Sequence, residues 1–264
     1  MQRTYRERKH ICGEYMEVEI FPVYTKAKGR GKRKKPTSEI QQRLNQRHAE
    51  AKLRRLLHTN FTEADLFVTL TFDDAHLPPS VEDAQKLLQN SLRRLKRRCT
   101  GLKYVYILEK GQENGRLHIH MVISGGMDEE NLAALWAMGK VKAAALEFNE
   151  DGLDGLAALA KYFTKGDTDN GGKPITWKRW VASRNLEKPV VEEHDRRLPH
   201  YKMAALCQDG GDTDYLETEY CGYEIAPYTV QTSEDIYGGY YLAAVLKKMP
   251  PRTDAWTEIW GLPF

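Results

Sequence analysis

Apolar and polar residues alternate regularly between residues 66 and 166. LFVTLTF (66–72) is rich in β-branched and aromatic residues and predicts a strand. Ser80 and Asp83 form a capping-box-like start, followed by apolar residues at helical spacing up to the RRLKRRC sequence. The next segments predict two strands of a hairpin, a helix, a strand and a helix over 103–110, 116–124, 128–138, 141–148 and 153–166. This order predicts an α+β fold: an antiparallel sheet flanked by helices, which we expect on one face.

The flanking regions give weaker patterns. Residues 14–24 predict a strand broken at Pro22, and an amphipathic helix is predicted from Ser38 onward. Beyond Gly166, which stands at a C-cap-like position, we predict short strands and one helix near 238–248. The expected organisation is a basic N-terminal region packed on the core, a central core and a C-terminal α/β extension. These parts cover 1–60, 61–170 and 171–264.

Composition changes this picture mainly through charge. The 264 residues are 41% hydrophobic and 10% aromatic, which excludes a disordered chain. The net charge of +3 hides an asymmetry, because residues 1–60 hold 16 Lys and Arg against 6 Asp and Glu, and the remainder is net −7. Such a split suggests a polyanionic partner. The four cysteines lie far apart, so we expect reduced thiols, and no run is long enough for a membrane span or secretory signal.

Two histidines stand at alternate positions within an apolar strand. Strand side chains alternate between faces, so His118 and His120 project to one side while Ile119 projects to the other. Two imidazoles at this spacing can chelate one divalent cation. The alternative is a pair of polar residues on a solvated sheet face.

Glu109 ends the preceding strand and adds a carboxylate to this pair. A turn centred on 113–114 places Glu109 opposite His118, on a strand face where an apolar residue would be expected. The alternatives are a solvated charge at the hairpin end, or Glu113 as the ligand if the turn folds back. A His₂-carboxylate set with open positions suits Mg²⁺ or Mn²⁺ acting on a phosphodiester.

The last helix of this region carries Tyr162 and Lys165. Residues three apart lie on the same side of a helix, so the Lys165 ammonium is expected near the Tyr162 hydroxyl. A tyrosine is a useful nucleophile when nearby cations stabilise its phenolate or the charge on a phosphate. Alone, this spacing has little specificity in a chain with 14 tyrosines.

Together these motifs resemble the HUH endonucleases, specifically rolling-circle replication initiators of plasmid and bacteriophage type. LFVTLTF resembles the first motif of that superfamily, LHIHMVIS (117–124) the second and KYFTK (161–165) the third, in the expected order. The resemblance covers about 66–166 and extends weakly to about 14–190. Ala158 stands four residues before Tyr162, where some phage initiators carry a second tyrosine, so the chain resembles the single-tyrosine type.

The resemblance implies a metal-dependent, sequence-specific nickase that also rejoins strands. Tyr162 would attack the scissile phosphate and keep the 5′ end, assisted by Lys165, while Glu109, His118 and His120 would hold Mg²⁺ or Mn²⁺. Expected partners are single-stranded or melted origin DNA, with a host helicase and polymerase, in the cytoplasm of a bacterial cell and without a membrane. The alternatives are a relaxase or single-strand transposase of the same superfamily, or a non-catalytic DNA-binding regulator on this fold.

DNA contact is also predicted outside these motifs. Lysines and arginines of the N-terminal region could track phosphates, although a charged helix face can simply be solvated. The candidates are Lys26, Lys28, Arg30, Lys32, Arg33, Lys34, Lys35, Arg43 and Arg47. Trp177 and Trp180 alternate with cations, a pattern that fits either base stacking or core packing.

Overall fold

The structure, a computed structural model, describes residues 4–24, 39–111, 115–149, 154–165, 179–196, 198–235 and 237–250. It is a mixed α+β protein with two antiparallel sheets flanked by helices, which confirms the predicted fold class. The chain forms two compact units. The terminal unit comprises Met1–Lys9, Glu14–Thr25 and Glu192–Phe264, and the central unit comprises His10–Gly13 and Lys26–Val191. Both chain ends therefore contribute to one unit, unlike the consecutive ranges expected from the sequence.

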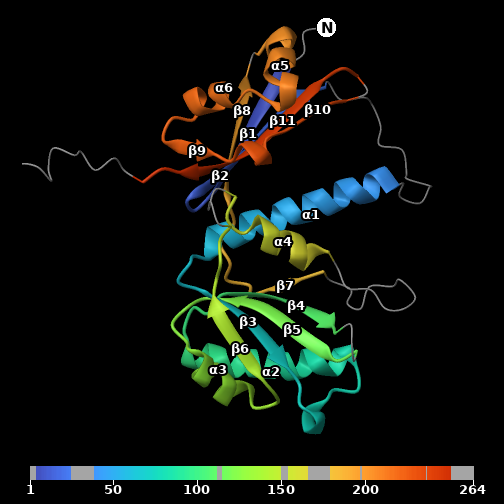
Figure 1. The fold of residues 1–264 in the computed structure, drawn as a ribbon, viewed down its shortest axis with the longest axis vertical. Helices are drawn as coiled ribbons and strands as arrows, with labels where there is room; N and C mark the ends of the chain where they lie inside the picture. The colour runs from blue at the N-terminus through green and yellow to red at the C-terminus, as the bar shows by residue number, and fades with distance from the viewer. Residues whose placement is uncertain are drawn as a thin grey trace, which may run out of the picture. The chain divides into compact units, whose positions relative to one another are not determined.

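The central unit is built on a five-stranded antiparallel sheet (Figure 1). Its strand order is β6-β3-β5-β4-β7. The strands are β3 (Leu66–Thr71), β4 (Tyr104–Lys110), β5 (Leu117–Ile123), β6 (Val141–Ala145) and β7 (Val181–Ala182). The β4–β5 hairpin pairs Glu109 with His118, so the predicted register is confirmed.

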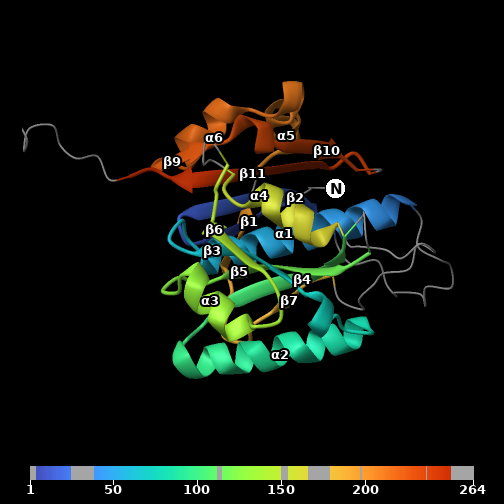
Figure 2. The ribbon, with the colours of Figure 1, turned by 60° about the horizontal axis from the view of Figure 1, so that its bottom comes forward.

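Helices cover both faces of this sheet, so the expectation of helices on one face was wrong (Figure 2). Helices α2 (Val81–Arg98) and α3 (Glu129–Trp136) pack on the face that presents Ile119 and Met121. Helices α1 (Glu39–Asn60) and α4 (Ala157–Thr164) pack on the opposite face. The reason is that this second face is also apolar, with Val105, Ile107 and Val122 buried beneath α1 and α4.

The start of α2 follows the sequence prediction. Ser80 is the N-cap, and its side chain accepts a hydrogen bond from the backbone N–H of Asp83 at 3.1 Å. This bond satisfies one of the free N–H groups of the first turn. A short 3₁₀ turn, η1 (Asp74–His76), precedes the helix.

The terminal unit contains most of a six-stranded antiparallel sheet with the order β10-β11-β2-β1-β8, in which β9 also pairs with β11. The strands are β1 (Thr4–Cys12), β2 (Tyr15–Val23), β8 (Val190–Arg196), β9 (Tyr223–Ile225), β10 (Gln231–Glu234) and β11 (Tyr240–Lys248). Helices α5 (His200–Leu206) and α6 (Thr213–Glu219) contribute to its core, and the 3₁₀ turns η2 (Gln208–Gly210) and η3 (Pro227–Thr229) connect elements.

Strand β11 replaces the helix predicted near 238–248, and that prediction was wrong. Leu242, Ala244 and Leu246 alternate and are buried in the core of the terminal unit. The apolar run YYLAAVL fits either period, and pairing with β2 and β10 selects the strand. Strand β1, which the sequence did not predict, is a neighbour of β2 in the same sheet.

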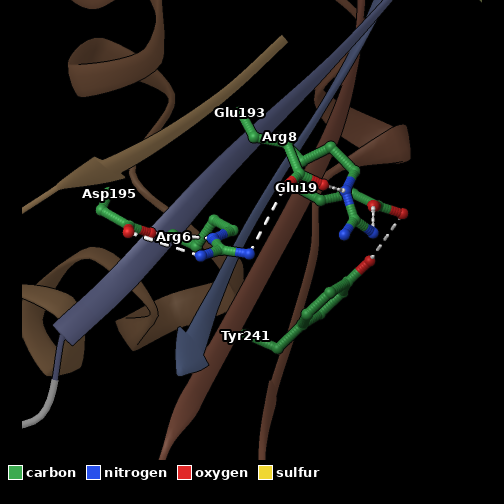
Figure 3. A network of polar contacts seen from close by, with 6 residues as sticks. All are labelled: Arg6, Arg8, Glu19, Glu193, Asp195 and Tyr241. Carbon is green, nitrogen blue, oxygen red and sulfur yellow. Dashed lines mark hydrogen bonds and ion pairs between the residues drawn. The ribbon is translucent and has the colours of Figure 1, made fainter. Parts of the chain in front are cut away.

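Ion pairs connect strands β1, β2, β8 and β11 across one face of this sheet (Figure 3). Arg6 Nε lies 2.8 Å from Asp195 Oδ1, and Arg8 Nε lies 2.6 Å from Glu193 Oε1. The Arg6 guanidinium lowers the pKa of the Asp195 carboxyl by hydrogen bonding. Because water screens these pairs, they contribute little to the free energy of unfolding.

Among the helices in the described ranges, none is both long and apolar enough to cross a membrane.

Candidate active site

The hairpin β4–β5 brings the carboxylate and imidazole candidates onto one face of the central sheet. Glu109 pairs with His118, and His120 pairs with Ile107 on one side and Thr69 of β3 on the other. Cross-strand partners share a face, so these side chains lie on the side of α1 and α4. Strand alternation therefore places both histidines as the sequence predicted.

His120 is held by contacts on both of its ring nitrogens. Its Nδ1 lies 3.1 Å from Thr69 Oγ1, and its Nε2 lies 3.3 Å from Glu109 Oε2. The ring also stacks on Phe67, with centroids 5.9 Å apart. Burial lowers the pKa of His120; the neighbouring Glu109 raises it and His118 lowers it further. A lowered pKa favours the neutral imidazole, the form that can bind a metal ion.

Tyr162 reaches the same point from helix α4. Its hydroxyl donates a short hydrogen bond to Glu109 Oε2, and its ring meets the His120 ring edge-on at 5.6 Å between centroids. The Tyr162 side chain stays 38% exposed, whereas the adjacent Phe163 is 1% exposed and packs in the core beneath α4. Phe163 therefore anchors the helix while Tyr162 remains open to a substrate.

Lys165 is the C-cap of α4, one turn beyond Tyr162. Its side chain is exposed and forms no ion pair with the described residues. The neighbouring carbonyl of Thr164 accepts a hydrogen bond from Gln46 Nε2 of α1 at 3.2 Å, and Arg179 in turn contacts Gln46. These contacts tie the end of α4 to α1, so the helix bearing Tyr162 and Lys165 is held at both faces.

Three of these supporting residues were not found by sequence reasoning. Thr69, Gln46 and Arg179 come from separate elements, and each acts through a contact that joins segments far apart in the chain. Thr69 alone had a sequence indication, because it lies in the first motif on a strand with alternating faces. The pairing of that strand with β5 could not be known from its own residues.

Residues 65–167 match a family model of replication-associated proteins, described by the name ORF2. This segment contains Glu109, His118, His120, Tyr162 and Lys165, and it supports a replication-associated role consistent with a rolling-circle replication initiator. Comparisons with curated proteins and with solved structures found no match.

The histidines and Glu109 of the matched segment have the donor chemistry for a divalent cation. His118 Nε2 is buried and has no hydrogen-bond partner among the described residues, which is costly unless another ligand engages it. His120 has a lowered pKa, and Glu109 supplies an oxygen ligand. Within the described residues, no three His, Cys, Asp or Glu side chains are grouped closely enough to hold a metal ion in this arrangement. It is the residue types, therefore, that fit the cation.

The predicted DNA-contacting residues lie mostly outside the described residues. Lys26 to Lys35, the side chain of Arg43, Gly166 and Trp177 all fall there. Arg47 is exposed on α1, as DNA contact would require. Trp180 is half-buried and packs against the core beneath α1 and α4, which favours core packing over base stacking.

Proposed function

We propose that this chain is a rolling-circle replication initiator that nicks and rejoins one DNA strand through Tyr162. The observation that carries the proposal is the hydrogen bond from the Tyr162 hydroxyl to Glu109, whose carboxylate also contacts His120. A half-exposed phenol beside a carboxylate and a neutral imidazole is the arrangement needed by a tyrosine nucleophile.

The bond changes of the proposed reaction balance within one transesterification. Tyr162 Oη forms a bond to the scissile phosphorus, and the bond from phosphorus to the 3′ oxygen of the preceding nucleotide breaks. The phenol proton leaves as the new bond forms, and Glu109 Oε2 is its hydrogen-bond acceptor in this structure. The leaving 3′ oxygen takes up a proton and becomes a 3′-OH, while the 5′ phosphate stays on tyrosine. Attack by a 3′-OH on that phosphotyrosine reverses these steps and rejoins the strand.

His118, His120 and Glu109 are the residues that would hold Mg²⁺ or Mn²⁺. A bound divalent cation would neutralise a non-bridging phosphate oxygen and make the phosphorus more electrophilic. The Lys165 ammonium, one helical turn from Tyr162, would add positive charge near the transition state.

The proposed substrate is single-stranded or melted origin DNA, because Tyr162 must reach a phosphate within one strand. The 3′-OH released by nicking would prime a host polymerase, and a host helicase would separate the strands. Sequence-specific recognition of the origin is part of the proposal.

The test compares wild type with Tyr162→Phe on a supercoiled plasmid that carries the DNA flanking the gene, with Mn²⁺. Wild type should convert the plasmid to open circles and leave a protein–DNA adduct, detected in denaturing gels through a label at the 3′ end of the nicked strand. Tyr162→Phe should abolish both products, because phenylalanine has no nucleophilic oxygen. Tyr201→Phe, a change at a tyrosine 70% exposed in the terminal unit, is the matched control and should behave as wild type.

Two outcomes would contradict the proposal. If Tyr162→Phe nicks and forms the adduct as well as wild type, Tyr162 is not the nucleophile. If wild type binds the DNA but never nicks it under any divalent cation, the non-catalytic regulator is the better interpretation.

A further inference from the structure

Helix α2 carries a group of cations on the sheet face opposite the candidate active site. Its C-terminal half, residues 91–98, contains five exposed basic residues and no acidic one. They are Arg93, Arg94, Lys96, Arg97 and Arg98. None of the five forms an ion pair with a described residue, whereas Arg6 and Arg8 of the terminal unit both do. We call these five residues the α2 basic surface.

Helix electrostatics do not account for this surface. The helix dipole favours cations in the last turn, which explains Lys96, Arg97 and Arg98. Arg93 and Arg94 precede that turn, and each stands four residues before another arginine. Like charges at this spacing destabilise a helix rather than support it. A helix selected only for solubility would place acidic residues at such positions.

Neutral partners hold several of the cations in place. Arg93 Nη1 donates to Asn90 Oδ1 at 3.0 Å, and Arg94 Nη2 donates to Ser91 Oγ at 3.1 Å. The Lys96 ammonium lies 5.0 Å from the centre of the Tyr104 ring. These contacts order the side chains but leave their charges uncompensated, which is the arrangement suited to an external anion.

The arginines border an open groove of about 400 Å³. It is lined by Leu87, Asn90, Arg93, Arg94, Arg97 and Met138. None of these is aromatic. Surfaces that hold single-stranded nucleic acid combine positive charge with rings on which bases stack. A cationic groove without such rings is suited to contacts with phosphates alone, as on a duplex.

We infer that the α2 basic surface binds the phosphate backbone of double-stranded DNA. That the polyanion is DNA rests on the proposed function; the surface itself rests on the charges and the groove. Because α1 and α4 cover the other sheet face, the duplex contact is separate from the site of Glu109 and Tyr162. The surface would thus hold duplex flanking the strand that is cut.

Fluorescence anisotropy with a labelled duplex of about two helical turns, in EDTA and at several salt concentrations, tests this inference. The variant Arg93→Gln/Arg94→Gln/Arg97→Gln should bind more weakly. Its plot of log affinity against log salt should be shallower than wild type by about 2.7, at about 0.9 for each lost phosphate contact. The double variant Arg93→Gln/Arg97→Gln keeps the bond from Arg94 to Ser91 and should lose about 1.8.

The matched control removes the same charge elsewhere in the central unit. Lys86→Gln/Arg184→Gln/Lys188→Gln changes three exposed cations, of which Lys86 lies on α2 and is paired with Asp83 at 3.0 Å. This control should keep the wild-type salt slope. Thermal melting of all variants checks that the fold is retained.

Three results would overturn the inference: an unchanged slope in both arginine variants, an equal loss in the control, or a loss confined to single-stranded oligonucleotide. Without divalent cations no nicking takes place, so this assay is independent of catalysis. Tyr162→Phe should bind the duplex as wild type does, and a protein that never nicks would still reveal the surface.

Discussion

Thr69→Val is the sharpest test of how His120 is oriented. The substitution removes the hydroxyl that lies 3.1 Å from His120 Nδ1 and keeps a β-branched side chain of nearly equal volume in strand β3. His120 then keeps its stacking on Phe67 but loses the contact that directs Nε2 toward Glu109.

The size of the effect follows from that single contact. A hydrogen bond between neutral groups contributes about 0.5–1.5 kcal/mol, or roughly two- to twelvefold in an equilibrium constant. Residues that orient a metal-binding histidine typically change affinity by about 10–100-fold. Because the His120 side chain is only 18% exposed, water replaces the hydroxyl poorly, and we expect the Kd for Mn²⁺ to rise about tenfold. The nicking rate at saturating Mn²⁺ should change much less.

Isothermal titration with Mn²⁺ measures this Kd directly, and nicking over a range of Mn²⁺ concentrations measures the two kinetic effects separately. The control is Thr71→Val, on the same strand and face, where the hydroxyl contacts the Lys140 backbone and no imidazole. The reasoning would be refuted if both valine variants bound Mn²⁺ equally well, or if Thr69→Val lowered the saturated rate without changing the affinity.

Two further predictions concern the fold and the thiols. Gly139→Ala should lower the free energy of unfolding by about 3 kcal/mol or more, because a Cβ there would collide with the Thr71 carbonyl oxygen. Gly101→Ala, also at positive φ but with open space around it, should lose only about 1–2 kcal/mol, and equal losses in urea denaturation would contradict this. In timed iodoacetamide labelling at neutral pH, Cys207 should react at least about tenfold more slowly than the exposed Cys221, because burial raises the pKa of Cys207 to about 11. Equal labelling rates would show that the Cys207 thiol is not shielded.

The sequence by itself determined the elements whose patterns are local. Helix α2 begins at its capping residue Ser80, and the β4–β5 hairpin pairs Glu109 with His118 as its turn predicted. The shared face of His118 and His120 also follows from strand alternation alone. In each case the determining interactions join residues close in the chain, so periodicity and turn length are sufficient.

Only the tertiary structure decided the remainder. Tyr162 meets Glu109 across 53 positions of sequence because α4 packs on the second apolar face of the sheet. Thr69 meets His120 across 51, and no pattern within either strand specifies that pairing. The same limit explains β11, whose apolar run suits a helix or a strand until β2 and β10 pair with it. Burial and hydrogen bonding between distant segments select among locally equivalent conformations, and those contacts exist only once the chain has folded.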